Sequence, residues 1–134
     1  MPTAQVTSEV VDLTNVQRLR SGRARLHANT RLMRAAQLQA EQMARAGRMA
    51  HVLPDAPYPS AKDRLAAANY HWQAYGENVA LGQLSAADAI DSWMHSSGHR
   101  KNMLSPAFTE LGAGYATDRK GRPYYVQVFG TPRD

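Results

Sequence analysis

The spacing of apolar residues changes once along this chain: it is helical up to about residue 104 and strand-like from residue 111 onward. Four helices are predicted, three from apolar side chains spaced three and four positions apart and the one over residues 60–68 from a capping pair at its start. These are residues 6–21, residues 30–47, residues 60–68, and a helix that begins at Ser85 and stops near Gly98, with a short helical turn over residues 99–104 after it. Residues 111–116 and 124–129 alternate instead, which predicts an antiparallel hairpin. Helices followed by strands favour an α+β fold built in layers.

Residues with known capping preferences mark the expected ends of the helices. Gly47 suits a helix C-terminus, where a left-handed backbone is often needed. Ser60 and Ser85 each precede an aspartate by three positions, which is the spacing of an N-terminal capping pair. Residues 69–83 are predicted to form a loop. A third strand, if the sheet has one, would come from this segment or from the loop after residue 21.

The length of 134 residues suits one domain, which we expect to span residues 1–134 with residues 1–5 as an N-terminal extension without regular structure. The absence of cysteine excludes thiol nucleophiles, zinc–thiolate sites and disulfides. No run approaches the roughly 18 apolar residues that a membrane span needs. The first residues have neither the charged nor the apolar region of a signal peptide, so we expect either a cytoplasmic chain or a mature fragment whose leader was removed.

The net charge is +5, and the arginines between residues 18 and 34 have no acidic residue among them. Such a basic stripe attracts phosphates or an anionic surface. No aromatic side chain lies among these arginines to stack on bases. A solvated helix face is the commoner reason for such a pattern, and we do not expect nucleic acid to be the partner.

Five histidines are candidates for metal binding or acid–base chemistry, although a single histidine is more often structural or exposed. They are His27, His51, His71, His95 and His99. His95 and His99 are four residues apart, which would place them on one helix face if Gly98 did not interrupt the helix. Ser96 beside His99 could form a nucleophile–base pair, but serine at a helix junction more often caps backbone amides. The sequence contains none of the motifs of zinc peptidases, serine hydrolases or phosphate-binding loops.

Several short motifs follow one another along the chain. They are Asn15-x-x-Arg18, His51, Gly76-Glu77-Asn78-Val79-Ala80, the segment from Trp93 to Leu104 with Ser96-Ser97-Gly98-His99-Arg100 inside it, Leu111-Gly112-Ala113-Gly114-Tyr115, and the segment from Tyr124 to Gly130. In this order and at these separations the chain resembles the CAP superfamily (cysteine-rich secretory proteins, antigen 5 and pathogenesis-related-1 proteins), specifically its bacterial SCP-like branch. The resemblance covers about residues 15–130. It implies an α+β fold, a three-layer α-β-α sandwich with a small antiparallel sheet.

In this family two histidines and two glutamates line an open cleft and can hold a divalent cation. The resemblance assigns the histidines to His51 and His99 and one glutamate to Glu77, whereas Ser96 stands in the place of the second glutamate. It therefore implies a weakly held cation such as Zn²⁺, bound by His51 and His99 with Glu77 and Ser96 beside them. The alternative is a polar network of His51, Glu77 and His99 that closes the cleft with no metal.

The resemblance and the missing carboxylate favour a secreted, non-catalytic interaction module, located outside the cell or in the cell envelope. Its partner would be a lipid, a sterol, a glycan or another component of the envelope, and the chain would act as a monomer. The alternative is a metal-dependent, peptidase-like hydrolase in which His51, Glu77 and His99 are catalytic and Glu77 is the general base. A nucleic-acid binder that uses the arginine stripe is the third hypothesis, and its affinity would fall steeply with salt.

Overall fold

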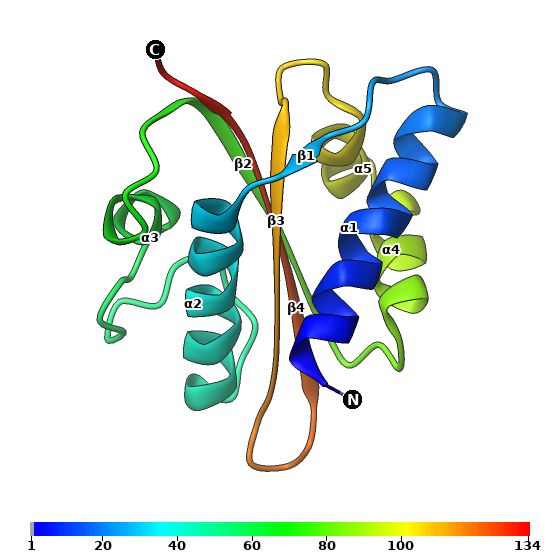
Figure 1. Cartoon of the computed structure of the whole chain (residues 1–134). Helices are drawn as coiled ribbons and strands as arrows, with labels where there is room; N and C mark the ends of the chain where they lie inside the picture. Colours follow the sequence, from blue (N-terminus) through cyan, green and yellow to red (C-terminus); the bar gives the residue numbers. More distant parts are fainter. Residues whose placement is uncertain (1) are drawn as a thin grey trace.

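The computed structural model describes residues 2–134, and within them five helices and four strands follow one another along the chain (Figure 1). The elements are α1 (Thr3–Arg20), β1 (His27–Ala28), α2 (Thr30–Ala46), α3 (Ala61–Ala67), β2 (Trp72–Leu81), α4 (Ala86–Met94), α5 (Ser97–Leu104), β3 (Glu110–Thr117) and β4 (Pro123–Pro132). The helix break expected near Gly98 occurs earlier, at His95 and Ser96, and Gly98 lies inside α5.

The first helix is longer than its apolar spacing indicates. α1 begins at Thr3, so residues 3–5 are its first turn and not part of the extension predicted over residues 1–5. The backbone N–H of Val6 donates to the carbonyl of Pro2 at 3.2 Å, and the Val6 side chain is buried, which anchors this turn. Met1 lies outside the described residues.

Capping contacts confirm the predicted ends of three helices. At α3, Ser60 Oγ accepts from the Asp63 N–H at 3.3 Å and the Asp63 carboxylate accepts from the Ser60 N–H at 3.1 Å, which completes a capping box. At α4, Ser85 Oγ accepts from the Asp88 N–H at 3.1 Å. α2 ends at Gly47, whose φ of 71° is the left-handed conformation that glycine adopts without strain.

The four strands form one sheet in the order β1-β3-β4-β2. β3 and β4 form the predicted antiparallel hairpin, and β2 pairs antiparallel with the other edge of β4. β1 adds two residues that run parallel to the start of β3. The prediction of a loop over residues 69–83 is wrong, because residues 72–81 are β2. Residues 77–80 of this strand are all buried, and apart from Val79 they have weak strand propensity, so pairing with β4 and not a local pattern stabilises it.

Helices cover both faces of this sheet, which confirms the three-layer α-β-α sandwich. Figure 1 shows α2 and α3 on one side of the strands and α1, α4 and α5 on the other. Each face has its own apolar core, and the side chains of β4 alternate between the two cores. Tyr125 and Phe129 pack with α1, α4 and α5, whereas Tyr124, Val126 and Val128 pack with α2 and α3. Their burial on both faces explains why residues 124–129 are almost entirely apolar or aromatic.

Two glycines of β3 let α2 lie directly against the sheet. A Cβ atom at Gly112 would overlap the backbone of Leu32 and Met33, and one at Gly114 would overlap the backbone of Ala36. The side-chain amide of Gln37 also pairs with the β3 backbone, accepting from the Tyr115 N–H at 3.0 Å. The close approach therefore depends on residues that lack a side chain, as at other sites where backbones meet.

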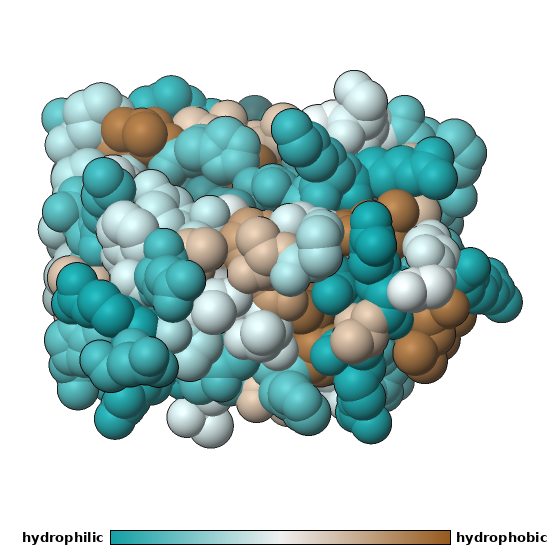
Figure 2. Space-filling view, turned by 90° about the horizontal axis from the view of Figure 1, so that it is seen from above, coloured by the Kyte–Doolittle hydropathy of each residue, from teal (hydrophilic) through white to brown (hydrophobic). Residues whose placement is uncertain are grey.

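Among residues 2–134, no helix combines the length and the apolar character that a bilayer span requires. Figure 2 views the molecule from above, at the end opposite the β3–β4 turn. Apolar residues form separate brown areas there, and hydrophilic residues surround them. This end of the molecule therefore presents no broad continuous apolar face.

Candidate functional site

Two of the three residues expected at the site, His51 and Glu77, are in direct contact. His51 lies in the connection between α2 and α3, and Glu77 lies in the middle of β2. The Nδ1 atom of His51 is 3.0 Å from Oε1 of Glu77. The carboxylate is buried, with 4% of its side chain exposed, whereas 55% of the His51 side chain is exposed. The imidazole is therefore anchored from inside the protein and reachable from solvent.

A third residue, Arg64 of α3, completes this contact, and sequence reasoning did not find it. Its Nη2 atom donates to both Glu77 oxygens, Oε1 at 3.0 Å and Oε2 at 2.9 Å. The same guanidinium donates to the backbone carbonyls of Tyr58, Pro59 and His51, each at 3.1 Å. Arg64 thus joins β2 to the connection that carries His51. Its only sequence signal is an arginine next to Leu65 on the inner side of a short capped helix, which is too common to be diagnostic.

His99 sits near the start of α5, and its ring is anchored in the same manner as that of His51. Its Nδ1 atom is 2.9 Å from Ser96 Oγ. Asn78, which follows Glu77 on β2, donates from Nδ2 to the His99 carbonyl at 3.0 Å and to Gln127 Oε1 at 3.0 Å. The neighbour of Glu77 therefore holds the backbone of His99. The fold brings residues 51, 77 and 99 to one place.

These contacts determine which ring nitrogen of each histidine remains free to bind a metal ion. A neutral imidazole donates from one nitrogen and accepts at the other. When His51 Nδ1 donates to the Glu77 carboxylate, its Nε2 atom carries the free lone pair. The Ser96 hydroxyl can likewise accept from Nδ1 of His99, which leaves the lone pair on Nε2 of that ring. Anchoring of the second nitrogen by a carboxylate or a hydroxyl is how proteins orient histidines that bind metals.

The two imidazoles differ in their electrostatic environment. The hydrogen bond to Glu77 raises the pKa of His51 above its ordinary value, against a smaller opposing effect of burial. Burial lowers the pKa of His99, and the charge of His51 lowers it further. The second effect requires the two rings to be close enough to repel one another when both are charged. Protonation of His51 therefore disfavours protonation of His99.

The described residues fit a divalent cation only in part. Within residues 2–134 there is no group of three or more His, Cys, Asp or Glu side chains arranged to hold a metal ion. His51 and His99 can each offer Nε2, but both oxygens of Glu77 already accept from Arg64 or His51. A cation here would have two protein ligands instead of the three or four usual for zinc. Glu77 and Ser96 would orient those ligands without binding the metal.

The other histidines lie outside this group. The Nδ1 atom of His95 is 2.8 Å from the carbonyl of Asp91, one turn back on α4, and the His95 side chain is exposed. The break at Ser96 separates it from the His99 ring, so the two histidines do not share a helix face. His27 belongs to β1, and His71 precedes β2; both are exposed.

A cavity of about 310 Å³ opens beside His51, and we call it the His51 cavity. It is lined by His51, Val52, Ser60, Ala61, Lys62, Tyr75 and Glu77. Tyr75 packs edge-on against Trp72, with 4.7 Å between ring centroids, and the Lys62 ammonium lies 5.7 Å from the Trp72 centroid. Trp72 and Tyr75 therefore form an aromatic wall next to the cavity, and the Lys62 ammonium lies over the Trp72 ring.

Comparison with known proteins identifies relatives over almost the whole chain. The profile of the cysteine-rich secretory protein family (CAP) matches residues 11–129. Two curated relatives come from Bacillus subtilis strain 168: the uncharacterized membrane protein YlbC, 38% identical over 127 residues, and the uncharacterized protein YkwD, 35% identical over 107 residues. The alignments cover 93% and 80% of this chain. They cover only 35% and 41% of the relatives, so the chain spans well under half of each.

Solved structures show the same fold. An extracellular protein of Bacillus anthracis strain Ames that contains an SCP domain superposes with a TM-score of 0.86 at 28% identity. That match covers 96% of this chain and 41% of the other. An outer surface protein of Borrelia burgdorferi superposes with a TM-score of 0.82 at 14% identity, covering 92% and 90% of the two chains. At that identity the likeness concerns the fold alone.

Proposed function

The chain belongs to the cysteine-rich secretory protein (CAP) family, and from this membership we propose that it is a non-catalytic, ligand-binding module of the cell exterior or envelope. The ligand enters the His51 cavity, and a divalent cation can be held weakly by His51 and His99 next to it. The Bacillus anthracis relative is an extracellular protein, which supports the proposed location. A cell-envelope lipid, sterol or glycan is the class of ligand we expect.

The hydrogen bonds of the Glu77 carboxylate are the observation that supports a non-catalytic module over a hydrolase. A general base needs a lone pair that can reach the proton of a water or a substrate. Both oxygens of Glu77 instead accept from the Arg64 guanidinium, and Oε1 also contacts His51. Ser96 stands where a second carboxylate would be needed, and its hydroxyl is used by His99. The contacts of Glu77 use three of the about four acceptor positions of a carboxylate, and the Glu77 side chain is only 4% exposed, which disfavours the general base that the peptidase-like alternative requires.

The same contacts support a cation between the two imidazoles. His51 and His99 would supply Nε2 atoms, because Nδ1 of each is anchored. A bound cation such as Zn²⁺ would supply positive charge and open coordination positions for an oxygen atom of a ligand. Such an ion would also link the connection between α2 and α3 to α5.

The lining of the His51 cavity favours a ligand with both polar and apolar faces. Tyr75 offers an aromatic ring, and Lys62, Ser60 and His51 offer groups that form hydrogen bonds. Cavities that combine a few polar groups with aromatic walls are typical of small-molecule sites. A sugar or the head of an envelope lipid has this mixed character.

The test is a Zn²⁺ titration by calorimetry, followed by assays for hydrolysis of peptide and ester substrates after Zn²⁺ loading. We expect one weakly bound ion per chain, loss of binding in His51→Ala and His99→Ala, and no turnover. His71→Ala and His95→Ala remove exposed histidines outside the site and should bind as the unmodified protein does. Turnover that His51→Ala abolishes would refute the non-catalytic proposal, and binding unaffected by both site variants would refute the cation site.

A further inference from the structure

We propose that the end of the molecule formed by the C-terminus of α2 and the β3–β4 turn docks on the surface of an anionic phospholipid bilayer. Five cationic side chains define this surface, which we call the basic end: Arg45, Arg48, Arg119, Lys120 and Arg122. None of them lines the His51 cavity. The inference therefore does not rest on the proposed function.

Tertiary structure brings the five cations together from two distant segments. Arg45 lies in the last turn of α2 and Arg48 follows its C-cap Gly47, whereas the other three belong to the turn between β3 and β4. Arg122 Nη2 donates to the carbonyl of Gly47 at 3.0 Å, which fixes the turn against the helix end. A hollow of about 270 Å³ is lined by both segments. In Figure 1 the two segments meet at the bottom of the molecule.

The positive charge of the basic end is not neutralised from within. Within residues 2–134, Arg122 is the one member of the five that pairs with a carboxylate, that of Asp118 at 2.7 Å. Asp118 is 3% exposed, and its oxygens also accept from the Lys120 N–H, the Arg122 N–H and the Tyr124 hydroxyl. Its capacity as an acceptor is therefore used within the turn. Arg45, Arg48, Arg119 and Lys120 remain exposed and free of ion pairs within the described residues.

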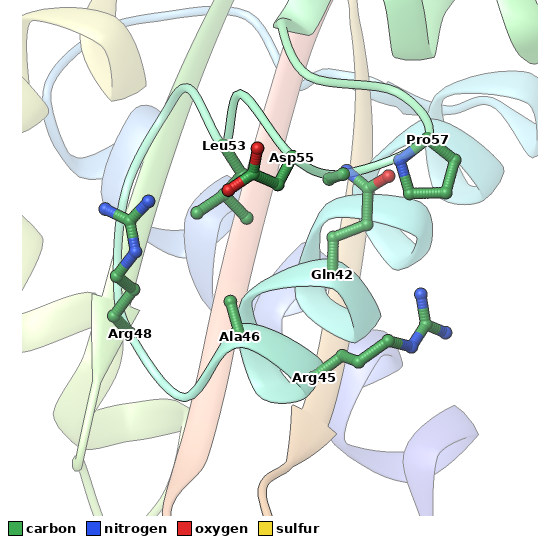
Figure 3. Close-up of a pocket in the computed structure, with 8 residues that line it drawn as sticks. Gln42, Arg45, Ala46, Arg48, Leu53, Asp55 and Pro57 are labelled. Carbon is green, nitrogen blue, oxygen red and sulfur yellow. The ribbon is translucent and has the colours of Figure 1, made fainter.

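Two exposed acidic residues lie near these cations: Glu41, one turn before Arg45 on α2, and Asp55. Asp55 lines an adjoining cavity of about 370 Å³ together with Arg45, Arg48, Leu53 and Pro57. Figure 3 shows the Arg48 and Arg45 side chains extended on opposite sides of this cavity, with Asp55 on the connection that crosses it. Neither carboxylate makes an ion pair within the described residues, so two exposed carboxylates face the four unpaired cations Arg45, Arg48, Arg119 and Lys120. The region keeps a net positive charge.

An exposed apolar side chain follows the cations directly and favours a bilayer over a soluble polyanion. Met49 comes directly after Arg48 in the connection between α2 and α3, and it is 49% exposed. Basic residues beside exposed apolar residues are the combination that binds the interface of an anionic membrane, because phosphates attract the cations and the acyl boundary takes the apolar groups.

The favourable interaction of cations with a helix C-terminus does not explain the whole surface. The partial negative charge at the end of α2 stabilises a cation such as Arg45 in its last turn. Arg119 and Lys120 lie in a turn and not on a helix. Their position next to the end of α2 adds to the positive field instead of balancing it.

The experiment is co-sedimentation of the protein with vesicles of phosphatidylcholine mixed with phosphatidylglycerol, compared with vesicles of phosphatidylcholine alone. The test variant is Arg45→Gln/Arg48→Gln/Arg119→Gln/Lys120→Gln. The control variant is Arg20→Gln/Arg25→Gln/Arg31→Gln/Arg34→Gln, which has the same net charge and changes exposed arginines elsewhere. Circular dichroism verifies that both variants fold.

We expect binding to the mixed vesicles only, and about fivefold weaker binding for each cation removed from the basic end. The control variant should bind within a few-fold of the unmodified protein. No binding to the mixed vesicles, or an equal loss in the two variants, would overturn the proposal.

A second variant separates a bilayer from a soluble phosphate polymer. Met49→Ser leaves every cation and every residue that lines the His51 cavity in place, and it should weaken vesicle binding without changing the binding of inorganic polyphosphate. If this variant binds vesicles as well as the unmodified protein does, or if polyphosphate or duplex DNA binds more tightly than the vesicles, a soluble polyanion is the partner and the bilayer proposal is wrong.

Discussion

The buried guanidinium of Arg64 donates hydrogen bonds to both carboxylate oxygens of Glu77, at 3.0 and 2.9 Å. This pair joins α3 to β2, and the same guanidinium holds the backbone of the connection that carries His51. The position of the His51 ring thus depends on an ion pair that lies beneath it. Arg64 is a positioning residue of the candidate site.

Replacement of Arg64 by methionine should destabilise the protein strongly. Arg64→Met leaves the Glu77 carboxylate buried without its partner, and loss of one member of a buried pair costs about 3–5 kcal/mol. The free energy of unfolding, measured with urea, gives the effect. Arg100→Met removes an exposed arginine that makes no ion pair among residues 2–134, and it should change stability by about 0.5 kcal/mol or less. A similar small effect in Arg64→Met would mean that the pair does not hold the fold.

The two site histidines should titrate in a definite order in the metal-free protein. His51 has a raised pKa because of Glu77, so it should become neutral above pH 6.5, whereas His99, with its pKa lowered by burial, should become neutral below pH 6.5. The imidazole proton shifts in an NMR titration measure both. Glu77→Gln should bring the pKa of His51 back toward its ordinary value, and a titration in the reverse order would contradict the geometry.

The same shifts give the sign of the pH dependence of stability. The raised pKa of His51 contributes stability that is present below about pH 6.5 and is lost as the pH rises through the folded-state pKa. The lowered pKa of His99 contributes stability that is present above about pH 6.5 and is lost as the pH falls through its folded-state pKa. Comparison of His51→Ala and His99→Ala in urea unfolding across this range should show opposite trends.

Loss of the Ser96 hydroxyl should weaken cation binding without abolishing it. Ser96→Ala removes the partner of His99 Nδ1, so the ring is no longer held with Nε2 available. Loss of such an anchor typically lowers metal affinity by about tenfold or more. The measurement is the dissociation constant for Zn²⁺ by calorimetry, with Ser97→Ala, an exposed neighbour, as the matched control. Equal affinities in the two variants would show that the hydroxyl does not orient His99.

A methyl group at position 112 should disrupt the packing of α2 on the sheet. In Gly112→Ala the new Cβ would overlap the backbone of Leu32 and Met33, and a backbone cannot move aside as a side chain can. We expect a loss of about 3 kcal/mol or more in the free energy of unfolding. Gly98→Ala adds the same group on α5, where no atom beyond its chain neighbours and the backbone of its own helix lies within 4 Å, and it should be neutral or stabilising. Thermal unfolding of the two variants measures the difference.

Local signals determined most of the helices. Ser60 with Asp63 and Ser85 with Asp88 form caps in the structure because a cap needs only residues three positions apart. The alternation of residues 124–129 predicted which side chains share a face, and the two cores contain them as expected. The placement of Glu77 on a strand was not predictable in this way, because residues 77–80 are buried without alternation.

The sequence by itself therefore determined the helices and the hairpin. The order of its motifs also determined the family, and it pointed to His51, Glu77 and His99 as the candidate site. Only the tertiary structure decided that Glu77 forms an ion pair with Arg64 and that Arg45 and Lys120 line the same hollow. A cap depends on residues three positions apart, and an apolar periodicity can be recognised within a few turns of chain, so both are visible in the sequence before the segment packs. Contacts such as Arg64 with Glu77 or Arg122 with Gly47 depend on where α3, α2 and the β3–β4 turn settle on the sheet, and this is set by packing over the whole domain.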